Sequence, residues 1–372
     1  MSIDPVKILT TPIRIRSLAV ATLLAMYIAS TLILFFQVVI PSFEDNSTDE
    51  TFAVDTIIYT DLADSVREGR FTPYVVGSLA HFPNTTWMPV LVWLALNSAF
   101  LVLLMNYAVF AISISILKRI FSIDLAIFIL LLLLNPTTTT SLLCLNKEIF
   151  DLLCMSLFLY SRIKQMRWLL GVTLVLALIN RYEFCAIMLL FVMAGSRLNP
   201  LREKRAATLL LLILSLNFAI PFFGGEMLAQ RFEEAQSANT IAALDQLQTH
   251  YLYVIAVFPK IAENLFGQLV NPKVWTAATT WLYVNLFNNI SYAIVIMIAA
   301  KKRLLTLQND LIYFAAFGAV LAAQSLSIQP RYFQFAYVLL CMQIAQSKAA
   351  YWAGNVAVRR IGRPRVAFAL VK

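Results

Sequence analysis

The sequence predicts an all-α, polytopic integral membrane protein, and its composition, its apolar runs and its charge pattern carry that prediction. Of the 372 residues, 60% are hydrophobic and 13% are charged, and the mean hydropathy is +0.76. Globular domains carry roughly 45–50% apolar and about 25% charged residues, so a single water-soluble core is excluded. The apolar residues gather in runs, several of them close to the roughly 20 residues that a membrane-spanning helix needs.

About ten apolar runs are expected to be transmembrane helices of a single membrane domain that covers residues 1–372. The first run is too long for a signal-peptide core and has no small-residue cleavage site, so we expect it to be retained. The runs from the third to the sixth are short enough to be tilted or re-entrant. The runs cover residues 17–40, 89–117, 121–134, 141–160, 168–180, 184–195, 206–223, 276–300, 311–327 and 334–346.

The charged residues between these runs set the expected orientation. Most of the 29 Lys and Arg residues fall on the side of the N-terminus, and most of the 20 Asp and Glu residues fall on the other side. Because basic loops stay in the cytoplasm, both termini are expected there. The net charge of +9 is then a topology signal, and nucleic acid is not expected as a partner.

Two longer outer loops, residues 41–88 and 224–275, are expected to carry short amphipathic helices. In the first loop, Asp55, Tyr59 and Leu62 are spaced to share one face of a helix. A carboxylate held at the membrane surface can deprotonate a hydroxyl or bind a cation that bridges to a phosphate. The alternative is that this acidic loop only solvates the outer face. In the second loop, residues 251–266 predict a helix in the interface plane that is interrupted at Pro259.

The sequence contains no phosphate-cradling glycine loop, no zinc-protease motif and no nucleophile elbow, and its cytoplasmic connections are short. The four cysteines lie in or beside apolar runs without metal-ligand spacing, so no metal site is expected. Any chemistry is therefore expected on the outer face.

Residues 55–71 read Asp-x-x-x-Tyr-x-x-Leu-Ala-x-Ser-x-x-x-Gly-x-Phe after the first apolar run. This pattern resembles the first outer loop of the C-type glycosyltransferase superfamily, over about the first 120 residues. These membrane enzymes use polyprenyl-phosphate-linked sugars and include relatives of the lipid-linked-repeat polymerases. An acidic residue of that loop is usually the catalytic base, which by this match is Asp55, with Asp61 as the second candidate.

Of the eight basic residues expected on the outer side, against the charge bias, three lie in tight turns between predicted helices. They are Lys147, Arg181 and Arg331. Ionisable groups at membrane depth are costly, which makes a functional role the default hypothesis. Arg chelates phosphate oxygens and Lys adds a point charge. If the three turns converge, they suit a lipid-linked pyrophosphate; if they do not, each is an isolated side chain that reaches the interface.

The residues beside these cations are the substrate-binding candidates, with Tyr59 from the first loop. Glu148 or Asp151 is expected to pair with Lys147, and the alternative is an internal ion pair that only anchors two helices. The tyrosines either stack on sugars or anchor the protein at the interface. The candidates in these turns are Glu148, Tyr182, Glu183 and Tyr332.

Together, these residues and the resemblance imply an outer-face glycosyltransferase or repeat-unit polymerase of surface polysaccharide assembly in a bacterial inner membrane. The donor would be a sugar or oligosaccharide on undecaprenyl (pyro)phosphate, and further partners would be membrane lipid and a chain-length regulator. No cofactor is assigned, although a divalent cation is compatible with the site. The alternatives are a flippase for the same lipid-linked glycans and a scaffold without activity.

Overall fold

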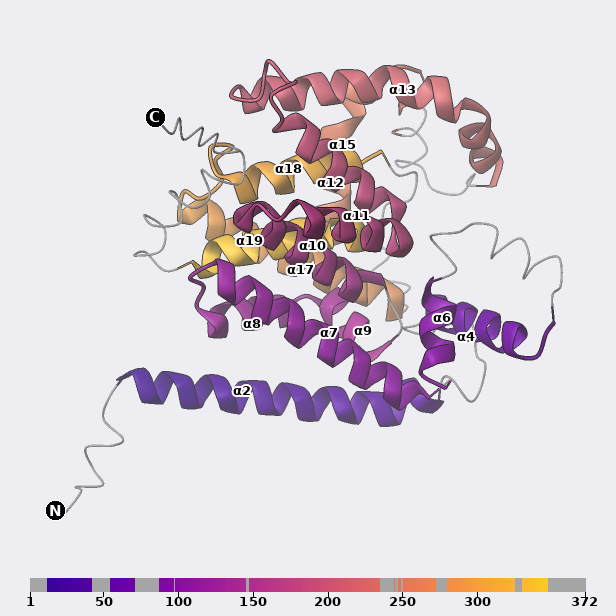
Figure 1. Ribbon diagram of the computed structural model, residues 1–372, viewed down its shortest axis with the longest axis vertical. Helices are drawn as coiled ribbons and strands as arrows, with labels where there is room; N and C mark the ends of the chain where they lie inside the picture. Colours follow the sequence, from indigo (N-terminus) through magenta and orange to yellow (C-terminus); the bar gives the residue numbers. More distant parts are fainter. Residues whose placement is uncertain are drawn as a thin grey trace, which may run out of the picture.

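The computed structural model describes residues 12–41, 54–70, 87–96, 98–144, 147–234, 244, 247–248, 250–271, 280–324 and 330–346. Within these ranges every named element is a helix, and one isolated antiparallel bridge joins Ile123 to Gln346. The all-α prediction is therefore confirmed for this part of the chain. Most helices run back and forth across the molecule, α2 lies along one edge, and α4 and α6 lie together at one end (Figure 1).

The elements are α2 (Pro12–Leu34), π-helical η1 (Phe35–Val39), α4 (Val54–Arg67), α6 (Trp87–Leu94), α7 (Ala99–Ile120), α8 (Leu125–Leu133), α9 (Pro136–Leu143), α10 (Lys147–Lys164), α11 (Arg167–Asn180), α12 (Tyr182–Ala194), α13 (Arg205–Glu234), α15 (Tyr253–Phe266), 3-10 helix η2 (Gly267–Leu269), α17 (Thr280–Lys301), α18 (Asp310–Ala322), 3-10 helix η3 (Pro330–Phe333) and α19 (Gln334–Ala345).

The apolar helices indicate a membrane-embedded protein. Among the described residues, three helices are long and apolar enough to cross a membrane: α7, the part Arg205–Phe222 of α13, and the part Leu282–Lys301 of α17. The bent pair α8 and α9 adds a fourth crossing if the two together form one span. Helices α11, α12 and α18 are apolar but shorter, with 14, 13 and 13 residues.

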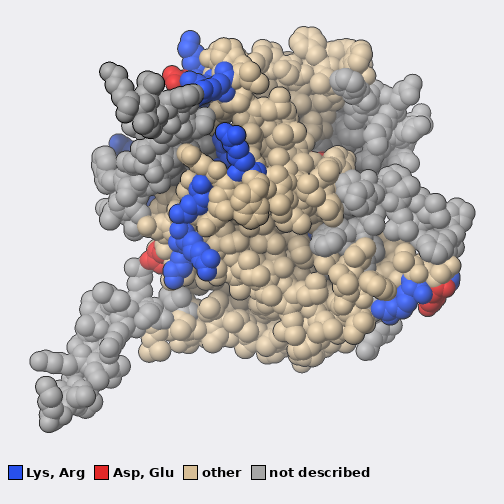
Figure 2. Space-filling model, viewed as in Figure 1, with Lys and Arg blue, Asp and Glu red and all other residues tan. Residues whose placement is uncertain are grey.

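The basic residues mark one end of the helix bundle. Helices α7, α10 and α17 all finish with basic residues in their last turn, namely Lys118, Arg119, Arg162, Lys164 and Lys301. Figure 2 shows Lys and Arg side chains gathered near this end, with a smaller group of mixed charge at α4. We call it the basic end, and the functional candidates lie at the opposite ends of the same helices.

Four expectations about where helices begin, end or break are wrong, and the backbone at Leu96 and Ser98 explains the first of them. The expected span 89–117 is two helices, because Leu96 takes a positive φ of 54° and Ser98 then caps α7 by accepting a hydrogen bond from Leu101 N. The expected span 141–160 is also divided, since α9 ends at Leu143 and α10 begins at Lys147. The residues between them, 145–146, lie outside the described ranges.

The other two corrections concern the second outer loop. Helix α13 continues through Pro221 to Glu234, so it extends past the expected boundary at residue 224. Helix α15 is not interrupted at Pro259, which lies on its exposed face. Proline has no backbone N–H, so one carbonyl of the preceding turn lacks its helical hydrogen bond. That carbonyl lies on the side of the helix away from the protein core.

The four-threonine run forms a short buried helix that is bent by 84° from α8. Asn135 starts this helix by accepting a hydrogen bond from Thr137 N at 2.9 Å, and Pro136 fits its first turn. Asn288 of α17 accepts from both the backbone N and the hydroxyl of Thr137, at 3.1 and 3.0 Å. Gln334 of α19 donates to the hydroxyl of Thr138 at 2.6 Å. Side-chain amides thus fix α9 between α17 and α19 where water is excluded.

The main apolar core lies between α10, α12, α18 and α19. The Phe191 and Phe314 ring centroids are 4.5 Å apart, and Phe158 packs against Phe314 at 5.3 Å. At Gly318 a Cβ would lie 2.3 Å from the ring of Phe335, so glycine is needed for α18 to pack this closely on α19. These contacts pack the four helices together.

We expect Asn288→Leu to destabilise the protein by about 1–2 kcal/mol, because it removes the acceptor for both bonds from Thr137. Unfolding in detergent micelles measures the change. The control is Phe287→Leu at the neighbouring position, which is 55% exposed and should change the unfolding midpoint little. Equal midpoints for the two variants would contradict the proposed fixing of α9.

Candidate functional site

The three predicted cations lie at the ends of helices opposite the basic end. Lys147 begins α10, Arg181 is the single residue between α11 and α12, and Arg331 lies in η3, directly before α19. The short connection after Lys164 places the start of α11 at the basic end. At about 1.5 Å per residue, α11 reaches roughly 21 Å from that end, whereas α7 and α17 reach about 33 Å. Arg181 is therefore recessed below the ends of the long helices.

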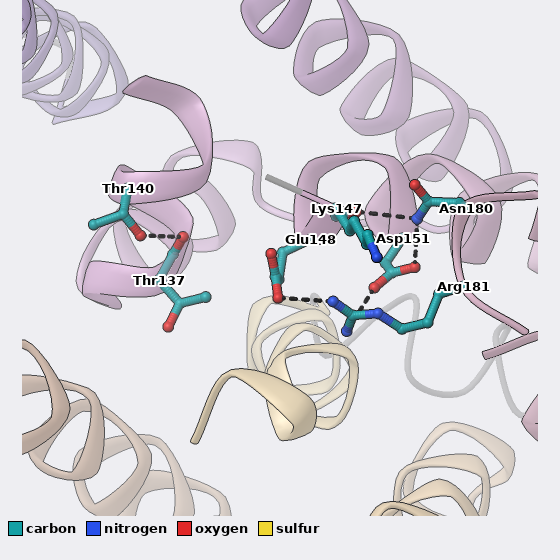
Figure 3. A network of polar contacts seen from close by, with 7 residues as sticks. All are labelled: Thr137, Thr140, Lys147, Glu148, Asp151, Asn180 and Arg181. Atoms are coloured by element: carbon teal, nitrogen blue, oxygen red, sulfur yellow. Dashed lines mark hydrogen bonds and ion pairs between the residues drawn. The ribbon is translucent and has the colours of Figure 1, made fainter. Parts of the chain in front are cut away.

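Arg181 forms a double ion pair with α10. Its Nη2 lies 3.0 Å from Glu148 Oε1 and its Nη1 lies 3.2 Å from Asp151 Oδ2 (Figure 3). The two carboxylates are three residues apart on α10, which places them on one face. Glu148 and Asp151 are 3% and 9% exposed, so the ion pairs are shielded from water.

Asn180 holds the same corner from α11. Its Nδ2 donates to Asp151 Oδ1 at 2.8 Å and to the Lys147 carbonyl at 3.2 Å. Both oxygens of Asp151 are thereby bound, one by Arg181 and one by Asn180. Glu148 differs, since its Oε2 is buried and has no hydrogen-bond donor among the described residues. Asp151 therefore has the bonding of a structural group, while Glu148 keeps an available acceptor.

Each of the three cations lies close to a tyrosine ring, and two of them share one ring. The guanidinium carbons of Arg181 and Arg331 each lie 5.7 Å from the ring centroid of Tyr332. Lys147 Nζ lies 5.6 Å from the ring of Tyr59 in α4. These are cation–π distances, and the contact of Arg181 with Tyr332 joins segments that are about 150 residues apart in the chain.

Helix α4 covers Lys147 with its apolar face. The predicted helix is present, and Tyr59 and Leu62 share its buried face with exposed fractions of 6% and 1%. Tyr59 and Ala63 pack against Met88 and Leu91 at α6. Asp61 is exposed and is not brought to the cations. Asp55 lies in the first turn of α4, and its side chain lies outside the described part of the structure.

The remaining candidates are arranged unequally around this site. Tyr182 begins α12 and is 50% exposed, whereas Glu183 is half-buried with its Oε2 shielded. Both carboxylates that were expected to pair with Lys147 form ion pairs with Arg181, and the charge of Lys147 also acts on Asp151. Asn180 was not among the predicted site residues, although an amide at the end of an apolar run beside Arg181 is itself a signal for a buried contact.

Within the described ranges, no group of three or more His, Cys, Asp or Glu side chains is placed to hold a metal ion. Comparison with protein-family models, curated proteins and solved structures gives no match for this chain.

We expect Arg181→Gln to destabilise the protein by about 3–5 kcal/mol, because it leaves two buried carboxylates without their cation. Thermal unfolding in detergent measures the loss. Arg67→Gln is the matched control, because Arg67 pairs with Asp64 where both side chains are about 40% exposed. That control should cost under about 1 kcal/mol, and similar losses in the two variants would contradict the structural role of Arg181.

Proposed function

We propose that this protein is an outer-face membrane glycosyltransferase or repeat-unit polymerase that uses sugars linked to undecaprenyl (pyro)phosphate. The gathering of Arg181 and Arg331 on one ring, beside Lys147, is the observation that supports this most. A membrane-embedded phosphate needs several cations at one depth, and these come from three separate turns. The resemblance of residues 55–71 to the C-type glycosyltransferase loop supports the same function.

The proposed setting is a bacterial inner membrane that the chain crosses about ten times, with both termini in the cytoplasm. The gathering of basic residues at one end of the bundle supports this orientation (Figure 2). The short helices α11, α12, α18 and α19 then count as tilted or partial crossings. In this orientation α4 and the cations face outward, where the lipid-linked donor is presented.

In the proposed reaction, an acceptor hydroxyl attacks the anomeric carbon of the donor sugar. The new bond joins the acceptor oxygen to that carbon, and the bond from the carbon to the phosphate oxygen breaks. Asp55 takes the proton of the hydroxyl, and the cations stabilise the charge that develops on the leaving phosphate. The free energy comes from the donor linkage, so no nucleotide is consumed at this step.

A flippase for the same lipid-linked glycans is the second candidate function. The 84° break between α8 and α9 favours it, since discontinuous helices near the membrane midplane are typical of transporters. Helices α7 and α10 do not share this kind of break within their own lengths. We rank the transferase first because Lys147, Arg181 and Arg331 all lie at the ends of their helices that are opposite the basic end.

Asp55→Asn is expected to keep the fold, since the side chains are nearly isosteric, and to abolish glycan transfer by removing the base. The measurement is the surface-polysaccharide ladder of a deletion strain that carries each variant on a plasmid. Asp61→Asn is the matched control in the same helix, and its exposed side chain predicts a ladder close to that of the wild type. A normal ladder with Asp55→Asn would overturn the assignment of the base.

A further inference from the structure

A cavity of about 200 Å³ lies between α2 and the bend that joins α8 to α9. Its walls come from the end of α2 with η1, from the end of α8, and from α9. The lining residues are Leu34, Val39, Leu133, Leu134, Pro136, Thr139, Thr140, Leu143 and Cys144.

Two departures from regular helix frame this cavity. On one side the chain is π-helical over Phe35–Val39, and on the other side α8 and α9 meet at 84°. The Tyr27 and Thr139 hydroxyls lie 2.7 Å apart, and those of Thr31 and Tyr107 lie 2.8 Å apart, so α2 is held to α9 and α7. The space beside these contacts therefore stays open instead of closing by helix packing.

The cavity offers an apolar surface to an occupant, although two threonines line it. The Thr139 hydroxyl is bonded to Tyr27, and the Thr140 hydroxyl donates to the Thr137 carbonyl at 3.1 Å. Water needs several polar partners to occupy a cavity, and these hydroxyls are already engaged. In a membrane-embedded protein such a space favours hydrocarbon.

The position of the cavity connects it to the cation site. Cys144 lines the cavity and Lys147 follows three residues later, at most about 11 Å along the chain. A lipid whose phosphate lies at Lys147 therefore has the first part of its hydrocarbon chain at the depth of Cys144. Helix α2 lies along one edge of the molecule in Figure 1 and exposes apolar side chains such as Met26 and Ile33, so a chain leaving the cavity can continue into the bilayer.

We propose that this cavity binds the first isoprene units of a polyprenyl phosphate whose phosphate group is bound at Lys147. The inference rests on the proposed function and assigns a separate part of the molecule to the lipid end of the donor. The volume suits this occupant, because an apolar cavity of about 150 Å³ holds a six-carbon ring and this one is somewhat larger. The long remainder of the chain stays in the bilayer.

The test uses the full chain in lipid nanodiscs and a polyprenyl phosphate with a diazirine in its second isoprene unit. After illumination, we expect the crosslinks to map to residues 34–39 and 133–144. Leu143→Trp fills the cavity and should lower this crosslinking about tenfold. Leu23→Trp is the control, because Leu23 is 49% exposed on α2 and does not line the cavity.

A second filling variant, a charge variant and two further probes complete the test. Val39→Phe is a second filling variant in case Leu143→Trp fails to fold, and it should lower crosslinking in the same way. Lys147→Gln should weaken crosslinking of the phosphate probe but not of the matching polyprenol, which lacks the phosphate. Equal crosslinking of a diazirine-labelled phosphatidic acid would overturn the isoprenoid assignment, and crosslinking that ignores both filling variants would overturn the cavity.

These outcomes separate the inference from the proposed function. Loss of polysaccharide in a deletion strain, with no crosslink in the cavity, would leave the transferase standing and remove the lipid site. An intact polysaccharide in that strain, with specific crosslinking, would support the lipid site and remove the transferase.

Discussion

The pairing of Arg181 with Glu148 and Asp151 is the interaction on which the half of this structure opposite the basic end depends. A guanidinium at this depth is costly unless it is paired, and two carboxylates on one face of α10 pair it. Because Arg181 is the only residue between α11 and α12, the same pairs fix both helices against α10. The contact of Arg181 with the ring of Tyr332 extends this control to η3 and α19.

This arrangement explains how positively charged side chains from distant segments share one site although they repel one another. Arg181 is held by α10, so the ring of Tyr332 and the neighbouring Arg331 have a fixed reference point. Lys147 precedes Glu148 directly and packs under the ring of Tyr59, which couples helix α4 to the same corner. In the proposed transferase, Arg181 therefore positions the site, and the neighbouring cations Lys147 and Arg331 bind the phosphate.

The sequence predicted the all-α class and the residues that share a helix face. It predicted less well where helices break and which helices touch. Spacing alone predicted that Tyr59 and Leu62 share one face of α4, because helical periodicity is local. The division of the expected span at Leu96 was not predicted, because hydropathy depends on residue type and carries no information about a positive φ in an apolar run. Convergence of Arg181 and Arg331 was left open, since it depends on how whole helices pack. The hydrogen bond from Thr137 to Asn288 was not predicted for the same reason.

The central claim is that these gathered cations serve chemistry on the outer face, and locating the lipid-linked intermediates of a deletion strain tests it most directly. Undecaprenyl-linked glycans would be extracted, sized and assigned to a membrane face by their accessibility to an added glycosidase. The account predicts that complete single repeats accumulate on the outer face while the polymer ladder disappears, and that plasmid-borne wild type restores it. Repeats trapped on the inner face would contradict the account and identify a flippase.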